Sequence, residues 1–318
     1  MSDQNKAASG FKVLQPGILT LIQDAGRFGQ HGIGLTTGGP LDPLAFNWAN
    51  RLCGNPQGST ALEVSIGGLV LEAQVDTQLC LTGAVMPLKI NGQEQESWRT
   101  QAVRAGDKIE LGYATEGSRA YLAVAGGFAI SPSFGSSATV TREAVGGLDG
   151  GKLKAGDILP ATQSRQSKHW LLPDIYRPAY GKHANLRVIP GYQQHAFSHY
   201  QQRLFFSNDY KVTDRSDRMG FRLEGPQIKP SIDGILSEGI CHGAIQVPAD
   251  GQPIVLMNDR QTIGGYPKIG SVLSLDTAAL AQLMPGSTVS FAPISLEDAH
   301  NIHSLAASYF ERVKPVSC

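Results

Sequence analysis

The amino-acid sequence predicts a mainly β protein with a few helices, arranged in two lobes. The chain has 318 residues, and a single hydrophobic core stops growing at roughly 250–300 residues, so two cores are expected. Apolar and polar residues alternate in short stretches, which is the period of a strand with one face in a core. The 37 glycines, roughly 12% of the chain against an average near 7%, indicate many tight turns between short strands.

The first lobe is expected over residues 11–160. In residues 62–67 apolar side chains alternate with polar ones, which predicts a half-buried strand whose Glu63 and Ser65 face water. A later alternating stretch ends at Asn91-Gly92, a pair that favours a type I′ hairpin turn because both residues adopt positive φ readily. Strands joined in this way form a barrel-like meander.

Two helices are predicted inside the lobes. Asp42 can accept backbone N–H groups as an N-cap, Pro43 suits a first turn, and an apolar stripe then continues to Gly54, which ends the helix. A shorter apolar stripe at helical spacing lies in residues 197–204. It predicts a second helix near the start of the second lobe.

The lobes are separated by a predicted connector over residues 161–185, which are polar and carry two prolines without a sustained period. The second lobe is expected over residues 186–295. A C-terminal helix over residues 296–313 is predicted from Ser295 and Asp298, which form a capping box ahead of an apolar stripe.

Composition excludes several classes of partner. The chain carries 27 Lys plus Arg and 27 Asp plus Glu, so no net field attracts nucleic acid. Its apolar runs are much shorter than the roughly 20 residues that span a bilayer, so no membrane contact is expected. The polar residues 1–10 lack the apolar stretch of a secretory signal, which favours the cytoplasm.

Cysteine and histidine spacing predicts neither disulfides nor a metal site. Cys53, Cys80 and Cys241 are expected as small core residues, and Cys318 as part of a loose terminus. The four thiols form no C-x-x-C pair, and paired ligands at close spacing are what structural zinc requires. No metal is therefore expected.

The principal candidate site follows a short apolar run, residues 254–257, that is expected to be a buried strand. After this strand, Asp259 can act as a general base or orient a donor, Arg260 offers a planar fork for an anion, and Lys268 is a compact cation. Glu238, Gln261 and Tyr266 are expected to contact substrate. The alternative is an ion pair of Asp259 with Arg260 that stabilises a turn, together with a solvated Lys268.

Two further clusters carry charged side chains beside glycines. Asp24 and Arg27 lie in a glycine-rich stretch, and Arg218 lies in residues 216–225. All three are candidates for substrate binding. The pattern at Asp24 and Arg27 favours a structural role in which they hold loops together, and a charged hairpin is the alternative for the Arg218 cluster. Neither cluster has the spacing of a P-loop or a dinucleotide fingerprint, and the chain has no G-x-S-x-G.

A set of motifs extends from Val13 almost to the end of the chain, at residues 13–17, 23–27, 38–42, 117–124, 217–220 and 237–270. Taken together, these motifs resemble a known family, the allophanate hydrolase subunit 2 or biotin-dependent carboxyltransferase-like proteins, which include the C subunit of 5-oxoprolinase. One departure from the family pattern is visible at residues 38–42, where Gly38 and Leu41 replace the usual serine and methionine.

The resemblance implies two cyclophilin-like β-barrel lobes and work within a complex. As the C subunit of an ATP-dependent 5-oxoprolinase, the chain would join the B and A subunits of the same complex, use ATP with Mg at a shared site, and be inactive alone. The complex would activate the lactam carbonyl of 5-oxoproline for hydrolysis to L-glutamate. Arg260 and Lys268 would then stabilise anionic oxygen while Asp259 positions or deprotonates a nucleophile.

The family leaves two alternatives open. One is the carboxyltransferase module of a biotin-dependent urea carboxylase, with biotin on another chain because no Ala-Met-Lys-Met-type segment is present. The other is a regulatory binding subunit without catalysis.

Overall fold

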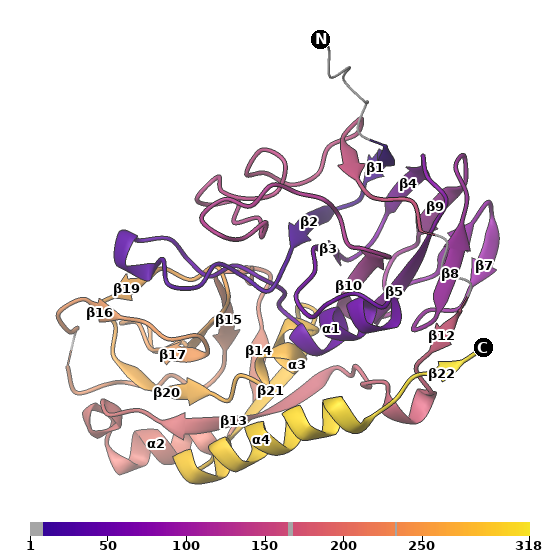
Figure 1. The fold of residues 1–318 in the computed structure, drawn as a ribbon. Coiled ribbons are helices and arrows are strands. Elements are labelled where there is room, and N and C mark those ends of the chain that lie inside the picture. Colours follow the sequence, from indigo (N-terminus) through magenta and orange to yellow (C-terminus); the bar gives the residue numbers. More distant parts are fainter. Residues whose placement is uncertain (1–8, 165–167, 233) are drawn as a thin grey trace. The chain divides into compact units, whose positions relative to one another are not determined.

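The computed structural model describes residues 9–164, 168–232 and 234–318. Strands dominate, which confirms the mainly β class (Figure 1). The chain forms two compact units, each described by itself. The first comprises Met1–Phe28, Gly38–Ala179 and Lys314–Cys318, and the second Gly29–Thr37 and Tyr180–Val313. Residues 29–37 thus belong with the second unit and residues 314–318 with the first. The domain boundaries predicted from the sequence, which divide the chain into consecutive segments, do not include these exchanges.

Two larger sheets of the first unit share a hydrophobic core. The six-stranded sheet has the order β11 (Ile158–Pro160), β1 (Gly10–Pro16), β4 (Leu69–Ala73), β9 (Lys108–Leu111), β6 (Leu88–Ile90) and β7 (Gln93–Gln95). The five-stranded sheet has the order β2 (Leu19–Gln23), β3 (Ala61–Ser65), β10 (Glu116–Val124), β5 (Thr77–Val85) and β8 (Thr100–Val103). Apolar side chains of both sheets share a buried cluster, among them Phe11, Leu71, Ile109, Leu62, Leu81 and Leu122.

Two local predictions for this unit are confirmed. Asn91 and Gly92 have φ of 51° and 78° between β6 and β7, as a type I′ turn requires. Helix α1 (Pro43–Leu52) starts from Asp42, whose carboxylate accepts from the backbone N–H of Ala45.

The strand β3 is buried on both faces, so the predicted exposure of Glu63 and Ser65 is wrong. Glu63 is 0% exposed, because this sheet face is covered by α1, which packs against the neighbouring β5 and β10. A buried carboxylate needs hydrogen-bond donors. Glu63 Oε2 accepts from Leu41 N at 2.9 Å and from the hydroxyl of Tyr121 at 2.7 Å.

The second unit contains a closed barrel of seven strands. Their order is β13 (His183–Pro190), β20 (Lys268–Val272), β17 (Ala244–Gln246), β18 (Ile254–Leu256), β15 (Gly220–Glu224), β14 (Tyr210–Val212) and β21 (Thr288–Pro293). A separate pair, β16 (Glu238–Gly239) with β19 (Ile263–Gly264), lies between barrel strands in the chain. The helical elements are η1 (His31–Ile33), η3 (Gln194–Ala196), α2 (His199–Phe206), α3 (Thr277–Ala281) and α4 (Leu296–Arg312).

Both predicted helices of this unit form. Ser198 caps α2 and Ser295 caps α4 through side-chain hydrogen bonds. The stretch 161–185 also contains regular structure, namely β12 (Trp170–Leu171), η2 (Asp174–Tyr176) and the start of β13. The strand β12 pairs with β22 (Val316–Ser317) in the first unit.

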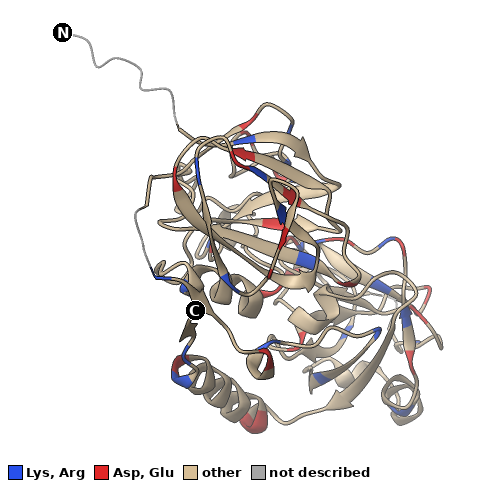
Figure 2. Cartoon of the chain, turned by 90° about the vertical axis from the view of Figure 1, so that its right-hand side faces the viewer, with Lys and Arg blue, Asp and Glu red and all other residues tan. Residues whose placement is uncertain are grey.

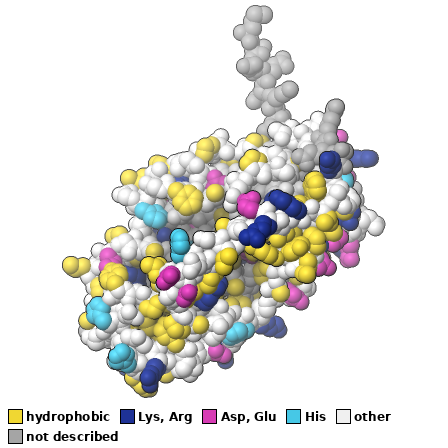
Figure 3. Space-filling view, turned by 60° about the horizontal axis from the view of Figure 1, so that its bottom comes forward, with side chains coloured by type: hydrophobic (Ala, Val, Ile, Leu, Met, Phe, Trp, Pro, Cys, Tyr) yellow, Lys and Arg dark blue, Asp and Glu magenta, His cyan; other side chains and the backbone are white. Residues whose placement is uncertain are grey.

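Residues of both charge signs are spread along the chain. Lys and Arg are interspersed with Asp and Glu along the ribbon in Figure 2, and on the face shown in Figure 3 exposed apolar side chains lie among charged ones and histidines. Among the described residues, no helix combines the length and apolar character needed to cross a membrane.

We predict that the hydroxyl of Tyr121 stabilises the first unit. It donates to Glu63 and accepts from Asp42 N at 2.7 Å, so Tyr121→Phe leaves buried polar groups short of partners. The free energy of unfolding should fall by about 1–3 kcal/mol, measured by urea denaturation. Tyr113→Phe, at a side chain 58% exposed, is the control and should change little. Equal stability of the two variants would contradict this role.

Candidate functional site

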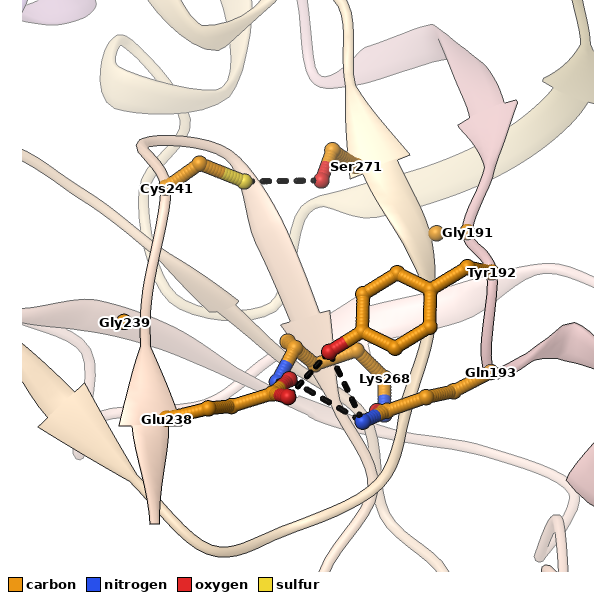
Figure 4. A pocket seen from close by; sticks show the side chains of 9 residues that line it. Gly191, Tyr192, Gln193, Glu238, Gly239, Cys241, Lys268 and Ser271 are labelled. Carbon is orange, nitrogen blue, oxygen red and sulfur yellow. Dashed lines mark hydrogen bonds and ion pairs between the residues drawn. The ribbon is translucent and has the colours of Figure 1, made fainter.

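The second unit has a pocket of about 170 Å³ at the ends of β13, β16 and β20. Its walls combine glycines with a small group of polar side chains, as Figure 4 shows. The lining residues are Gly191, Tyr192, Gln193, Glu238, Gly239, Cys241, Lys268, Gly270 and Ser271. Concave sites with a few converging polar groups are typical of small-molecule binding.

Lys268 supplies the positive charge of the pocket. It is the first residue of β20 and is only 8% exposed, and an ammonium group is costly to bury without a partner. That partner is Glu238 of β16, whose Oε1 accepts from Lys268 Nζ. The ion pair joins a barrel strand to the short β16–β19 pair.

Glu238 is held by further donors. The Tyr192 hydroxyl donates to its Oε2, and Gln193 Nε2 donates to its Oε1 at 3.0 Å. The hydrogen bonds from Lys268 and then from Tyr192 lower the pKa of Glu238 below its usual range, because they stabilise the charged form. Glu238 is therefore an anion at neutral pH.

Gln193 connects the two charged residues through both ends of its amide. Its Oε1 accepts from the backbone N–H of Lys268 at 2.9 Å, while its Nε2 donates to Glu238. The side chain is 6% exposed. Gln193 therefore ties the backbone of Lys268 to the carboxylate of Glu238.

Cys241 and Ser271 form another part of the pocket wall. Cys241 Sγ lies 3.1 Å from Ser271 Oγ, and the thiol is exposed. The prediction of Cys241 as a core residue is thus wrong, because it follows β16 in a loop at the pocket. Cys53 and Cys80 are buried and Cys318 is exposed, as expected.

Asp259 lies outside the pocket lining and pairs with Arg218. Arg218 Nε and Nη2 donate to the two carboxylate oxygens, each at 2.9 Å, and Asp259 N donates to Arg218 O at 2.9 Å. The residues are 3% and 6% exposed. This bidentate pair, rather than a pair of Asp259 with Arg260, joins the turn after β18 to the turn before β15.

Arg260 is buried beside the loop that carries Cys241 and His242. Its Nε donates to Ile240 O at 3.1 Å and its Nη1 to Met257 O at 3.4 Å. Burial lowers the pKa of Arg260 below its usual range. Burial, with the charge of Arg260 in addition, lowers the pKa of His242 to about 4, so His242 is neutral at pH 7.

Gln261 and Tyr266 flank β19, which pairs with β16 through Gly264 opposite Glu238. Gln261 is half-buried and Tyr266 is 46% exposed. Neither lines the pocket. Both belong to the segment that positions Glu238.

Asp24 and Arg27 belong to the first unit and bind its own loops. Asp24 accepts from Ser136 Oγ at 2.5 Å and from Ser137 N at 2.7 Å. Arg27 is 0% exposed and donates to backbone carbonyls of residues 133–138. These contacts hold residues 133–138 in place, which is the structural role that the sequence pattern favours over substrate binding.

Of the site residues predicted from sequence, the structure places Lys268 and Glu238 together in the pocket. The roles assigned to Asp259, Arg260 and Lys268 stay predictions. Tyr192, Gln193, Cys241 and Ser271 were missed as pocket residues. Tyr192 and Gln193 follow β13, far in sequence from the Ser237–Gly270 motif, and no local pattern marks them.

Comparison with known proteins identifies a family. Residues 33–293 match the family described as carboxyltransferase domain, subdomain A and B. The chain is 36% identical over 304 residues to the 5-oxoprolinase C subunit of Escherichia coli (strain K12), covering 95% of this chain and 97% of that protein. It is 35% identical over 297 residues to the 5-oxoprolinase C subunit of Haemophilus influenzae, covering 93% and 94%.

A solved structure is also similar over nearly the whole chain. The Kluyveromyces lactis urea carboxylase matches with a TM-score of 0.90 and 28% identity, covering 98% of this chain and 30% of that chain. The similarity thus extends to a module of a longer protein.

We predict that Asp259 contributes chiefly to stability. Asp259→Ala removes the carboxylate that accepts two hydrogen bonds from the buried guanidinium of Arg218, so the free energy of unfolding should fall by about 3–5 kcal/mol. Adding Arg218→Met should restore part of this loss, because the buried positive charge is then removed as well. Chemical denaturation of the single and double variants measures both effects. Unchanged stability in Asp259→Ala would contradict the structural role.

Proposed function

The chain belongs to the family of carboxyltransferase domains with subdomains A and B, and from this premise we propose that it is the C subunit of an ATP-dependent 5-oxoprolinase. The complex would hydrolyse the lactam 5-oxoproline to L-glutamate. Two relatives that carry this name match almost their full length, which supports a component of a hydrolase complex. A cytoplasmic location belongs to the same proposal.

The observation that carries the proposal is the position of Lys268 in the pocket. Its ammonium group is largely buried yet borders a cavity. Opening a lactam places negative charge on the carbonyl oxygen, and a fixed cation in a poorly solvated site stabilises such charge strongly. Lys268 would thus hold the carbonyl oxygen, while Glu238 contacts the ammonium and Gln193 holds the backbone of Lys268.

The proposed complex needs further chains. The relatives are named as C subunits, which supports other members of the assembly, and we propose that these are the A and B subunits of the same complex. The pocket of this chain contains one ammonium group. Its carboxylate, from Glu238, and its hydroxyls, from Tyr192 and Ser271, already have hydrogen-bond partners and are not expected to attack a carbonyl unaided. The chain alone is therefore expected to be inactive.

The pocket does not fit ATP. A triphosphate requires several converging N–H groups or cations, whereas Lys268 is the lone cation among the lining residues and Glu238 beside it would repel phosphate. The described residues also contain no group of three or more His, Cys, Asp or Glu suited to a metal ion. We place ATP with Mg at a site shared with the other members of the complex, and no step of this chain's chemistry is assigned to it.

A second candidate function is the carboxyltransferase module of a biotin-dependent urea carboxylase. The overlap of 98% of the chain with the Kluyveromyces lactis urea carboxylase favours it. Biotin, when bound, carries the carboxyl group that is transferred. The donor set fits its ureido ring, since Lys268 would donate to the ureido oxygen while Tyr192 and Gln193 position Glu238 beside it.

We predict that Lys268→Ala abolishes most turnover of the reconstituted complex. ATP hydrolysis that depends on 5-oxoproline, and release of glutamate, would be measured for this chain with its candidate partners and with each partner omitted. Loss of the cation should lower kcat by about 100-fold or more, as for other groups that stabilise an oxyanion.

Lys211→Ala is the matched control, because Lys211 is an exposed lysine on the barrel strand β14 and should leave kcat unchanged. If Lys268→Ala merely weakened assembly and kept full turnover, its catalytic role would be wrong. Carboxylation of urea dependent on bicarbonate and a biotin carrier, without 5-oxoproline turnover, would support the second function instead.

A further inference from the structure

One wall of the pocket presents a hydrogen-bond donor and an acceptor side by side. An ammonium group only donates and an ionised carboxylate only accepts. Lys268 Nζ contacts Glu238 Oε1 directly, so the two groups face the cavity as neighbours (Figure 4). A ligand that matches both must carry an acceptor and a donor on adjacent atoms of one edge.

Both groups retain capacity for a ligand. The ammonium has three N–H donors, and one of them is directed to Glu238. The carboxylate has roughly four acceptor positions, and it receives hydrogen bonds from Lys268, Tyr192 and Gln193. Each can therefore form one more hydrogen bond without releasing its present partners.

Resting on the proposed function, we propose that Lys268 and Glu238 together bind the amide edge of a cyclic amide. Lys268 Nζ donates to the C=O, and Glu238 accepts from the N–H. A ring forces both of these amide groups to the same side, so a lactam or a cyclic urea presents them as one edge, whereas an extended peptide points them in opposite directions. The substrate class is thus a ring amide whose C=O and N–H lie on the same side.

Tyr192 and Gln193 act as positioning residues in this arrangement. Neither was marked by the sequence, yet Tyr192 fixes one oxygen of Glu238 and Gln193 fixes the other, while Gln193 also holds the backbone of Lys268. A side chain locked by neighbouring hydrogen bonds loses little freedom when ligand binds. The pair is therefore organised before the amide arrives.

The size of the pocket suits a single small ring. Its volume is about 170 Å³, and a protein cavity of about 150 Å³ is known to hold benzene. Gly239 lines this space, and a Cβ added there would meet no atom within 4 Å, so the glycine leaves room for a ligand. A polyanion is disfavoured, because Glu238 next to Lys268 would repel it.

The test compares 5-oxoproline with the lactone of the same skeleton, in which a ring oxygen replaces the N–H. Binding is measured by calorimetry with the full chain, alone and with its candidate partner chains. The unsubstituted protein should bind the lactam at least about tenfold more tightly, since the ring oxygen of the lactone and the carboxylate of Glu238 are both acceptors and cannot form a hydrogen bond with each other. In Glu238→Gln this ratio should fall towards one, because the glutamine amide can also donate to the ring oxygen.

Two variants keep the test informative if Glu238→Gln folds poorly. Tyr192→Phe retains the carboxylate but removes a donor that orients it, so the lactam-to-lactone ratio should fall by a smaller factor. Gly239→Val tests whether both ligands bind in this pocket. A Cβ at Gly239 would meet no atom within 4 Å, so the larger side chain should be tolerated. By narrowing the pocket it should weaken the binding of lactam and lactone alike, without changing the ratio of their affinities.

The results separate this inference from the proposed function. If the complex turns over 5-oxoproline but Glu238→Gln leaves the lactam-to-lactone binding ratio unchanged, the inference would be overturned and the function kept. The opposite outcome is absence of turnover together with binding of the cyclic urea 2-imidazolidinone. If that binding depends on the ligand N–H, and Glu238→Gln removes this dependence, the function would be overturned and the inference supported. No binding of either amide to any assembly would overturn the inference as well.

Discussion

The buried ammonium of Lys268 is the constraint on which the proposed site depends. At 8% exposure it requires a counter-charge, and Glu238 supplies it from outside the barrel. This requirement ties β16 to β20, and Gln193 adds the loop after β13. Three segments distant in sequence are thereby held in one geometry. The same interaction that neutralises the charge also creates an adjacent donor and acceptor at a cavity, so folding and ligand recognition use the same atoms.

The other buried charges of the second unit have a different role. Arg218 donates two hydrogen bonds to the carboxylate of Asp259, and Arg260 donates to backbone carbonyls. None of the three lines the pocket. They hold the turns around β18, and so they support the frame that carries Lys268. The first unit uses a similar device, in which Glu63 and Tyr121 fix the residues that precede α1.

Local signals in the sequence were sufficient for the helices α1, α2 and α4 and for the hairpin turn at Asn91-Gly92, whereas the short helix α3 was not predicted. Asp42, Ser295 and Asn91-Gly92 act through neighbours within a few residues, so their patterns are readable. The exposure of Glu63 was not, because it depends on α1 covering a sheet face. Lys268 and Glu238 were found through their common motif, but Tyr192 and Gln193 reach the pocket only through the barrel pairing of β13 with β20. Asp259 was assigned a chemical role because the sequence does not show its buried partner, Arg218.

The most direct test of the account is a crystal structure of the full chain with a cyclic amide bound. The account predicts that the ligand occupies the pocket of the second unit, with its carbonyl oxygen about 2.7–3.2 Å from Lys268 Nζ and its N–H directed at Glu238. A ligand bound at the Asp24–Arg27 loop, or in the pocket with its carbonyl turned away from Lys268, would contradict the central claim.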